Sequence, residues 1–169
     1  MSTTLILIRH GETRLNALGV FQGQLDESLN DVGLGQARAV AASMADLEPD
    51  AIYASDLLRA TQTADEVAKL TGHEVHTDER LREIHCGSWH GRSIDEVSQE
   101  LPQLVEFRRS GQDFRRSDTG ETAAEVADRV REALFGTHGQ AVGQEILVGN
   151  VPFRVIGVMA PKPAPSPED

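Results

Sequence analysis

An uninterrupted apolar run, Leu5–Ile8, stands near the start of the chain and leads directly into Arg9-His10-Gly11. A run without polar alternation is typical of a strand in a parallel sheet that is covered on both faces. A second such run, Ala51–Ala54, precedes Ser55 and Asp56. In open parallel sheets, ligands bind beyond the carboxyl ends of the strands. The sequence therefore predicts an α/β domain in which the loops after these two strands lie side by side.

Helical patterns alternate with the expected strands along the rest of the chain. Residues 74–77 favour a third strand. Strands that alternate with helices are typical of layered α/β domains. The signals for helix boundaries are Asn30 before a helix over about 31–47, Ser55 and Gly72 at the two ends of the next helix, capping boxes at Ser93–Glu96 and Thr122–Glu125 before helices at about 94–100 and 123–135, and Pro102 in the first turn of a short helix.

The composition narrows the class of protein and its partners. A length of 169 residues suits one domain with a hydrophobic core, and 39% hydrophobic with 25% charged residues is typical of a globular protein. The formal net charge of −11 argues against a nucleic acid or an anionic membrane as a partner, because both favour lysine and arginine. The single cysteine, Cys86, excludes an intrachain disulfide. The first residues have no basic leader and the apolar run is too short to span a membrane, so we expect a cytoplasmic protein.

The sequence Arg9-His10-Gly11-Glu12-Thr13, followed by Asn16, carries groups that suit phosphate chemistry. A neutral imidazole is nucleophilic near neutral pH, and a covalent intermediate divides one hard displacement into two easier steps. The planar guanidinium of Arg9 matches phosphate oxygens, and Gly11 lets the backbone pass close to a neighbouring group. A lone histidine after a strand more often satisfies a loop carbonyl. This combination instead favours His10 as a nucleophile that accepts a phosphoryl group.

Three further segments contain candidate motifs of the site: Ser55–Ala64, Leu81–Gly91 and Gly120–Thr122. Together with the Arg-His-Gly-Glu-Thr motif they resemble, in the same order, the motifs of the histidine phosphatase superfamily, in the branch that includes cofactor-dependent phosphoglycerate mutases. The likeness covers about residues 3–135. It implies an α/β, three-layer phosphoglycerate mutase-like fold with a mostly parallel central sheet.

The resemblance implies a role for each matching residue. His10 would accept the phosphoryl group, and Glu83 would protonate the leaving alkoxide and then activate water. The residues expected to bind the substrate are Arg9, Asn16 and Arg59 on the phosphoryl oxygens and Gln22, Gly23 and His85 on the leaving-group side. The histidines expected at the surface are His73, His76 and His90. Arginines serve where other phosphatases use cations, so neither a metal nor another cofactor is implied.

The Leu81–Gly91 segment is more similar to the phosphatases of the family than to the mutases, and resembles those that act on glucosyl-3-phosphoglycerate and those of broad specificity. The resemblance therefore implies hydrolysis of a small phosphomonoester, a phosphorylated sugar or glycerate. Residues 1–142 would form the phosphatase domain, with a helical cap at about 92–122 that selects the substrate. A cofactor-dependent phosphoglycerate mutase is the alternative within the family.

The C-terminal part departs from the family pattern. The family has a second histidine in a Ser-His-Gly-Gly-type loop after a later strand, but no histidine follows His138 and the expected position reads Gly149-Asn150-Val151-Pro152. Residues 143–159 form an atypical β-rich segment, which resembles a stretch of macrolide-exporter-type transporter permeases. Residues 160–169 are Pro-rich, which is typical of disorder. The family's C-terminal part is therefore either truncated or replaced by a foreign or frameshifted ending, or this is a divergent C-terminus.

These departures have physical consequences. Loss of the second imidazole is expected to weaken the orientation of His10 and to reduce the activity. Loss of the closing strands would expose a sheet edge, which favours a homodimer. A further alternative is therefore a catalytically inactive phospho-ligand binder or a defective gene product. The expected partner of the chain is a small phosphorylated metabolite.

Overall fold

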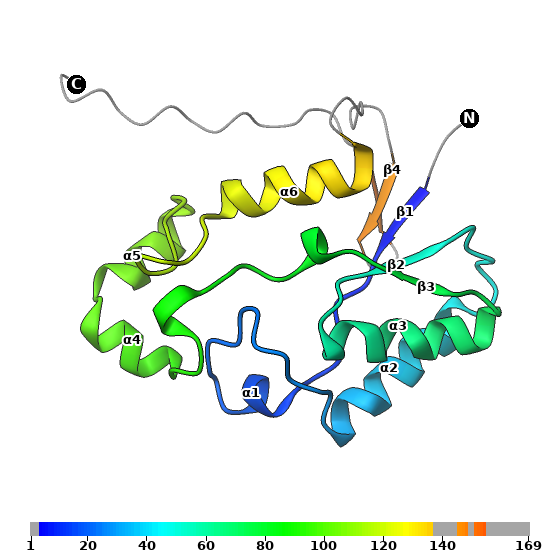
Figure 1. Ribbon diagram of the computed structural model, residues 1–169, viewed down its shortest axis with the longest axis horizontal. Coiled ribbons are helices and arrows are strands. Elements are labelled where there is room, and N and C mark those ends of the chain that lie inside the picture. Colours follow the sequence, from blue (N-terminus) through cyan, green and yellow to red (C-terminus); the bar gives the residue numbers. More distant parts are fainter. Residues whose placement is uncertain (1–3, 137–144, 149–150, 155–169) are drawn as a thin grey trace. The chain divides into compact units, whose positions relative to one another are not determined.

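The computed structural model describes residues 4–136, 145–148 and 151–154 (Figure 1). Its contacts divide the chain into two compact units, one formed by the two terminal parts of the chain and the other by residues 9–133. Helices and strands are mixed along the chain, and each unit contains a pair of parallel strands, so the predicted α/β class is confirmed. The expected disordered tail, residues 160–169, lies outside the described residues.

The first unit contains a sheet of β1 (Thr4–Leu7), β4 (Glu145–Val148) and β5 (Val151–Arg154), in the order β1-β4-β5. β1 pairs with β4 in parallel, and β4 pairs with β5 in antiparallel, so the predicted N-terminal strand is confirmed. The prediction that the apolar run Leu5–Ile8 is covered on both faces of the sheet is wrong, because Leu7 is 49% and Ile8 is 41% exposed. Within the described residues β1 has a neighbouring strand, β4, on one side only, so it is an edge strand of this sheet.

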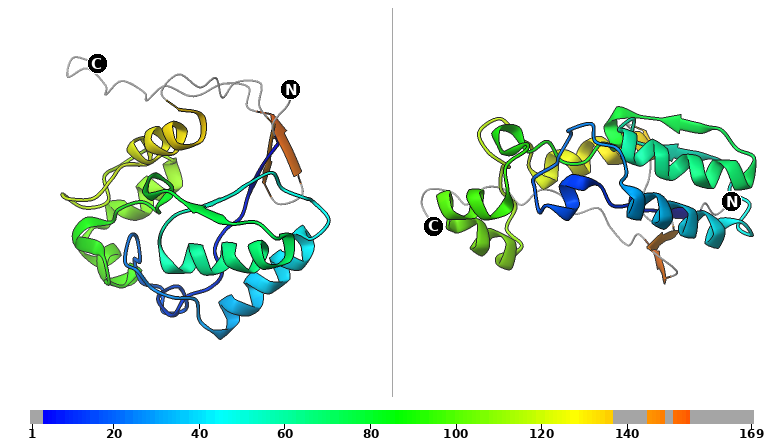
Figure 2. Two further views of the ribbon diagram at one scale, coloured as in Figure 1. Left: turned by 45° about the vertical axis from the view of Figure 1, so that its right-hand side comes forward. Right: turned by 90° about the horizontal axis from the view of Figure 1, so that it is seen from below.

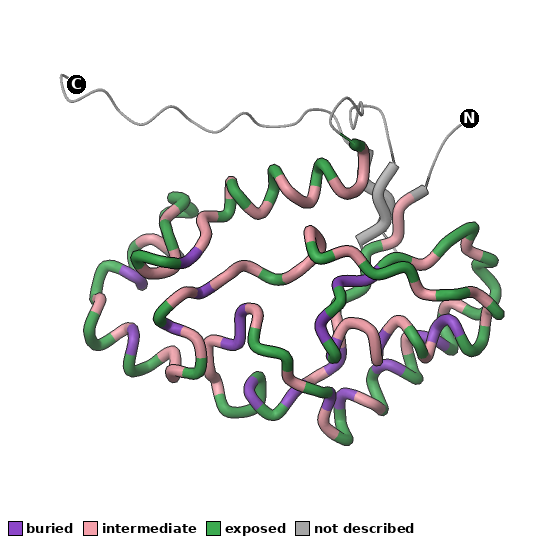
Figure 3. Tube along the Cα trace, viewed as in Figure 1, coloured by how far each residue is buried: buried purple, intermediate pink, exposed green. Residues whose placement is uncertain are grey.

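The second unit contains two parallel strands, β2 (Ile52–Ala54) and β3 (Val75–Thr77), at the places where the sequence predicts them. Its two longest helices are α2 (Asp31–Met44) and α3 (Leu58–Thr71). α3 packs against both strands and against α2. The two helices run side by side in both views of Figure 2. Their buried positions, shown in Figure 3, are Gly33, Ala37 and Ala41 on α2 and Arg59, Thr63, Val67 and Ala68 on α3.

Several helix boundaries follow the local signals, although α2 ends at Met44, before the expected end near residue 47, and Pro102 is the N-cap of the helix that begins at Gln103. Asn30 caps α2 through a bond that its side chain accepts from the Gly33 N–H, and Gly72 ends α3 in the left-handed conformation. Ser55 is not the cap of α3, because the helix begins at Leu58. The Leu58 N–H instead donates to the carboxylate of Asp26, 2.7 Å away on a separate loop. A carboxylate from elsewhere in the unit therefore satisfies the donor that a local cap would have satisfied.

The remaining helices are α1 (Arg14–Ala17), α4 (Ile94–Glu100), α5 (Gln103–Ser110) and α6 (Ala123–Phe135). Both predicted capping boxes are present, at the start of α4 and at the start of α6. α4 and α5 lie within the predicted cap region and contact each other. A hydrophobic cluster of Cys86, Trp89, Val97 and Leu104, with Phe21, Ile84, Leu101 and Phe114 packed against it, joins these helices to the segment that follows Glu83.

Candidate active site

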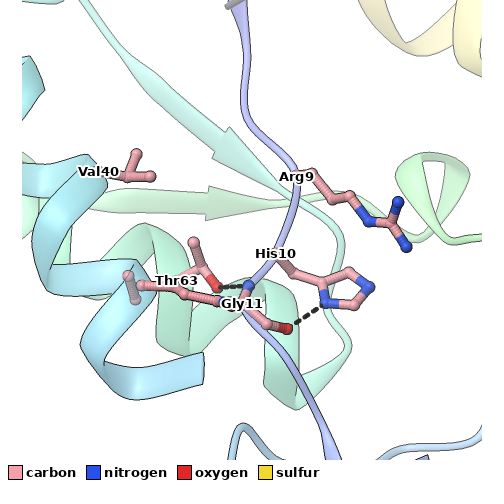
Figure 4. A pocket seen from close by; sticks show the side chains of 7 residues that line it. Arg9, His10, Gly11, Val40 and Thr63 are labelled. Carbon is pink, nitrogen blue, oxygen red and sulfur yellow. Dashed lines mark hydrogen bonds between the residues drawn. The ribbon is translucent and has the colours of Figure 1, made fainter. Parts of the chain in front are cut away.

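The loop after β1 crosses the first turn of α2 at a distance that only glycines permit. A Cβ atom on Gly11 would lie 2.3 Å from the Gly33 carbonyl oxygen, and one on Gly33 would lie 2.0 Å from the Glu12 carbonyl oxygen. The Gly11 N–H donates to the hydroxyl of Thr63 on α3, at 3.1 Å (Figure 4). The backbone beside His10 is therefore held by both helices, and its side chain is aimed by that attachment.

His10 presents one particular ring nitrogen for chemistry. Its Nδ1 lies 2.7 Å from the Gly11 carbonyl oxygen and donates to it (Figure 4), so a neutral ring carries its lone pair on Nε2. Burial lowers the pKa of His10, and the charges of Arg59 and Arg9 lower it further, against the Gly11 bond and the charge of Glu83, which raise it. The imidazole is therefore neutral at neutral pH, with its lone pair on Nε2.

Arg59, on the first turn of α3, faces that nitrogen. Its side chain is fully buried, and its Nε lies 3.2 Å from His10 Nε2. The other two guanidinium nitrogens donate to the carbonyl oxygens of Leu25 at 2.8 Å and Gly23 at 2.6 Å. Burial lowers the pKa of Arg59, and the charges of Glu83 and Asp26 raise it. A planar cation of this kind can bind phosphoryl oxygens next to His10.

The predicted leaving-group residues Gln22 and Gly23 lie on the loop that Arg59 holds. Gln22 is buried, and its side-chain oxygen accepts a bond from the Thr13 hydroxyl at 2.5 Å. Gly23 has a φ of +47°, and a Cβ atom there would lie 2.3 Å from the Nε2 of His90. In this structure Gln22 therefore binds Thr13, the N-cap of α1, and the Gly23 carbonyl oxygen accepts a bond from Arg59.

Asn16 and Arg9 both remain open to solvent. The Oδ1 of Asn16 accepts a bond from the backbone N–H of Thr13 at 3.1 Å, as part of a capping box. Because that oxygen is engaged, the Nδ2 group is the part of the amide that can donate to a ligand. Arg9 is exposed and extends on the same side of the chain as the ring of His10 (Figure 4).

Glu83, the predicted proton donor, is exposed, and its carboxylate accepts the N–H of Ile84 at 2.8 Å. Its charge acts on both His10 and Arg59. The Glu83 carbonyl oxygen accepts bonds from Gln24 and from Arg129, each at 3.0 Å. The structure therefore brings together an imidazole, a buried guanidinium and a carboxylate from segments that are far apart in the sequence.

His90 and Arg129 are part of this arrangement, although the sequence gives no reason to select them. The prediction that His90 is a surface residue is wrong, because its Nε2 accepts the backbone N–H groups of Gln24 at 3.2 Å and Cys86 at 3.1 Å. Burial lowers its pKa, and so does the charge of His85, whose ring lies edge-on at 4.5 Å. His90 therefore joins the loop that holds Arg59 to the segment that carries Glu83.

A cavity of about 210 Å³ opens beneath the His10 loop. Its lining residues are Arg9, His10, Gly11, Gln36, Ala37, Val40 and Thr63 (Figure 4). Arg59, Asn16 and Glu83 are not among the residues that line it. Of the segment where the second histidine is expected, Gly149 and Asn150 lie outside the described residues, as does His138, whereas Val151 and Pro152 belong to β5.

In residues 4–136, 145–148 and 151–154, no three His, Cys, Asp or Glu side chains are grouped so that they could hold a metal ion. The same ranges contain no helix with the length and apolar character needed to cross a membrane.

The chain is similar to several known proteins. The sequence profile of the histidine phosphatase superfamily (branch 1) matches residues 5–149. A metal-independent phosphoserine phosphatase of Arabidopsis thaliana is 38% identical over 149 residues, which cover 86% of this chain and 63% of that protein. A probable phosphoglycerate mutase of Photorhabdus laumondii is 37% identical over 142 residues, which cover 84% of this chain and 66% of that protein.

Similarity extends to solved structures. A mycobacterial glucosyl-3-phosphoglycerate phosphatase complexed with VO3 superposes with a TM-score of 0.66 at 33% identity, over 78% of this chain and 63% of that one. This likeness confirms the predicted phosphoglycerate mutase-like fold. The chain spans 66% or less of the length of each of these three proteins. Because the family profile covers most of the sequence, this chain belongs to the histidine phosphatase superfamily (branch 1).

Proposed function

We propose that this protein hydrolyses a small phosphomonoester, of the phosphorylated sugar or glycerate type, through a phosphohistidine formed on His10. The observation that carries the proposal is the ring geometry of His10. Its Nδ1 is committed to the Gly11 carbonyl oxygen, and its Nε2 faces the buried guanidinium of Arg59 at 3.2 Å. A neutral, oriented imidazole beside a fixed cation is the arrangement that phosphoryl transfer to nitrogen requires.

The reaction divides into two displacements. In the first, Nε2 of His10 attacks the phosphorus atom, the bond from phosphorus to the ester oxygen breaks, and Glu83 gives its proton to the leaving alkoxide. In the second, Glu83 takes a proton from water, the water oxygen attacks phosphorus, and the bond from nitrogen to phosphorus breaks to release phosphate. Proton transfer of this kind contributes about 10²–10⁴-fold to the rate.

Local positive charge supports this assignment in a protein whose formal net charge is −11. Arg59 is buried at the nucleophile and Arg9 is the residue next to it, and each contact between a guanidinium and a phosphoryl oxygen contributes about 1.5–3 kcal/mol. The Nδ2 group of Asn16 would supply a further donor. These groups would stabilise the phosphoryl oxygens as charge develops on them.

The chemical class of the substrate rests on the relatives. The similar proteins that are named as phosphatases act, by their names, on phosphoserine and on glucosyl-3-phosphoglycerate. Both compounds are phosphate monoesters of small molecules that carry a carboxylate. Glucosyl-3-phosphoglycerate joins a sugar to a phosphorylated glycerate, which supports the phosphorylated sugar or glycerate type as the substrate.

The test of the proposal is chemical trapping of the intermediate. The protein is mixed with p-nitrophenyl phosphate, and both the burst of p-nitrophenol and an acid-labile phosphohistidine are measured. The variant His10→Ala is expected to lose both, whereas His76→Ala, which changes an exposed histidine, should retain both. Hydrolysis that persists unchanged in His10→Ala would show that another group is the nucleophile.

A phosphoglycerate mutase is the second candidate, favoured by the likeness to the Photorhabdus laumondii protein. A mutase transfers phosphoryl groups between 2- and 3-phosphoglycerate faster than it releases free phosphate. The two products are separated in a single assay that follows both phosphoglycerates and free phosphate. Transfer that exceeds release would replace the phosphatase proposal.

A non-catalytic binder of phosphorylated ligands is the third candidate. It is favoured by the sequence Gly149-Asn150-Val151-Pro152, which has no histidine at the position where the family has its second one. Vanadate binding, measured by the stabilisation that it gives against heat, would then occur without turnover and without a phosphohistidine. Detection of the phosphohistidine excludes this candidate.

A further inference from the structure

Arg129 of α6 donates hydrogen bonds to the backbone of residues 80–83, the segment that ends at Glu83, and to Glu121. Its Nη1 donates to the carbonyl oxygens of Arg80 at 2.7 Å and Arg82 at 2.6 Å, and its Nη2 donates to that of Glu83 at 3.0 Å. The remaining two donors, on Nε and Nη2, bind the two carboxylate oxygens of Glu121 at 2.9 Å each. The side chain is 18% exposed. A guanidinium has five N–H donors, and here all five are engaged.

Glu121 binds the backbone of His85, on the C-terminal side of Glu83. One of its carboxylate oxygens accepts the N–H of His85 at 2.7 Å, and its own N–H donates to the His85 carbonyl oxygen at 2.8 Å. The bond with Arg129 lowers the pKa of Glu121, so its carboxylate is charged at neutral pH and compensates the guanidinium. The backbone before and after Glu83 is thus tied to the start and the second turn of α6.

The side chain of Glu83 depends on this backbone for its position. In the part of the chain that the structure describes, its carboxylate makes one hydrogen bond, to the N–H of the next residue, Ile84. The side chain is exposed and is not packed into the interior. A shift of the backbone would therefore move the carboxylate by a similar amount, and a misplacement of about 1 Å can lower a rate by about 10²-fold.

We infer that Arg129 is a positioning residue for the proton donor, acting through the carbonyl groups of residues 80–83, and that Glu121 orients it. The inference rests on the proposed function, because it assigns Glu83 the role of general acid. Arg129 does not touch the substrate in this assignment. Its effect on the reaction should therefore appear only where the position of Glu83 matters.

The experiment compares two substrates that differ in their need for a proton. Glycerol 3-phosphate has a poor alkoxide leaving group that requires protonation, whereas p-nitrophenyl phosphate has a good one that does not. The variant Glu83→Gln should lose about 10²-fold or more in kcat/KM on glycerol 3-phosphate and only a few-fold on p-nitrophenyl phosphate. Arg129→Met should show the same selective loss, and the double variant should lose no more than Glu83→Gln alone.

The matched control is Arg131→Met, which removes an arginine from the same helix. Arg131 is 43% exposed and pairs with Asp128. This variant should change kcat/KM by less than about 2-fold on either substrate, since surface ion pairs contribute little. Arg129→Lys keeps the charge but has three donors in place of five, so an intermediate, equally selective loss is expected.

A second readout does not require turnover. Amide hydrogen exchange of residues 80–85 should be faster in Arg129→Met, or in Arg129→Lys where the first variant does not fold, and unchanged in Arg131→Met. Unchanged exchange in the Arg129 variants overturns the inference. Equal losses on both substrates in these variants, beside a selective loss in Glu83→Gln, overturn it as well. If Glu83→Gln itself shows no selectivity, the general-acid role in the proposed function is the part that fails.

Discussion

The guanidinium of Arg59 binds two parts of the candidate site, the ring of His10 and the loop that carries Gly23 and Leu25. Its Nε faces Nε2 of His10, and its two terminal nitrogens donate to the carbonyl oxygens of Gly23 and Leu25. The same guanidinium therefore sets the distance between the His10 ring and the loop that carries Gly23 and Leu25. Because the group is buried, its bonds are worth more than the same bonds in water.

Replacement of Arg59 should consequently affect both stability and activity. Arg59→Met is expected to lower the free energy of unfolding by about 1–3 kcal/mol, because the buried Gly23 carbonyl loses its donor. Loss of the cation should lower kcat on p-nitrophenyl phosphate by about 10²–10³-fold. Urea denaturation and initial rates measure the two effects. Arg14→Met, which removes an exposed partner of Glu27, is the control and should change neither by a comparable amount.

The environment of His10 determines the pH dependence that the proposed phosphorylation should show. Burial and the charge of Arg59 lower the pKa of His10, and only the neutral ring is nucleophilic. The acidic limb of kcat/KM should therefore have its midpoint below the ordinary histidine value of about 6.5. A pH–rate profile on p-nitrophenyl phosphate measures it. A midpoint at or above that value would contradict the lowered pKa that burial and Arg59 give to His10.

At the scale of elements, the first turn of α2 is a support for the His10 loop as well as a helix. Gly33 lies in that turn, where the carbonyl oxygen of Glu12 approaches to a distance that excludes a side chain. The side chain of Gln36, one turn later, accepts the Glu12 N–H at 2.8 Å. The helix thus supplies a hydrogen-bond acceptor for the backbone of the His10 loop. Its close contact with that loop also fixes the position of the loop relative to α3.

Two glycines of α2 give opposite predictions for the same substitution. Gly33→Ala should lower the free energy of unfolding, because the new Cβ would lie 2.0 Å from the Glu12 carbonyl oxygen and the loop must move. Gly35→Ala should raise it by about 0.5–1 kcal/mol, because nothing lies within 4 Å of that Cβ and alanine favours helix. Thermal and urea unfolding of both variants test the pair. A stabilising Gly33→Ala would show that the close approach is absent in solution.

At the scale of the whole molecule, lowered pKa values couple stability to pH in one direction. Burial lowers the pKa of His10 and His90, so the unfolded chain binds protons at these sites more strongly than the folded one. Their contribution to the free energy of unfolding is fully present above the pKa of the unfolded chain, about 6.5, and is lost as the pH falls through the lower pKa values of the folded protein. Arginine partners likewise lower the pKa of Asp56 and Glu121, whose contribution is lost below about pH 4.

We therefore expect the free energy of unfolding to be nearly constant from pH 8 to 7 and to decrease in two stages below it. Urea denaturation between pH 8 and 3 measures the curve. The variant His90→Gln, which keeps an acceptor but cannot be protonated, should show a smaller decrease between pH 7 and 5. A stability that rises between pH 7 and 5 would mean that the two imidazoles are not shielded as the structure indicates.

The features that the sequence determined by itself are local ones. The caps of α2 and α4, the end of α3 at Gly72 and the strands before His10 and Ser55 were all predictable, because each depends on residues within about four positions of one another. The motifs around His10 and Glu83 also identified the family, which the profile over residues 5–149 supports independently.

The tertiary structure decided what depends on residues far apart in the chain. Asp26 satisfies the start of α3 in place of Ser55, and Arg129 reaches a carbonyl group 49 residues earlier. His90 accepts an N–H from Gln24, 66 residues before it. No local pattern carries such pairings, because an isolated histidine or arginine is equally suited to solvent. Only the folded backbone, which brings unpaired carbonyl and N–H groups beside these side chains, makes burial and hydrogen bonding more favourable for them than exposure.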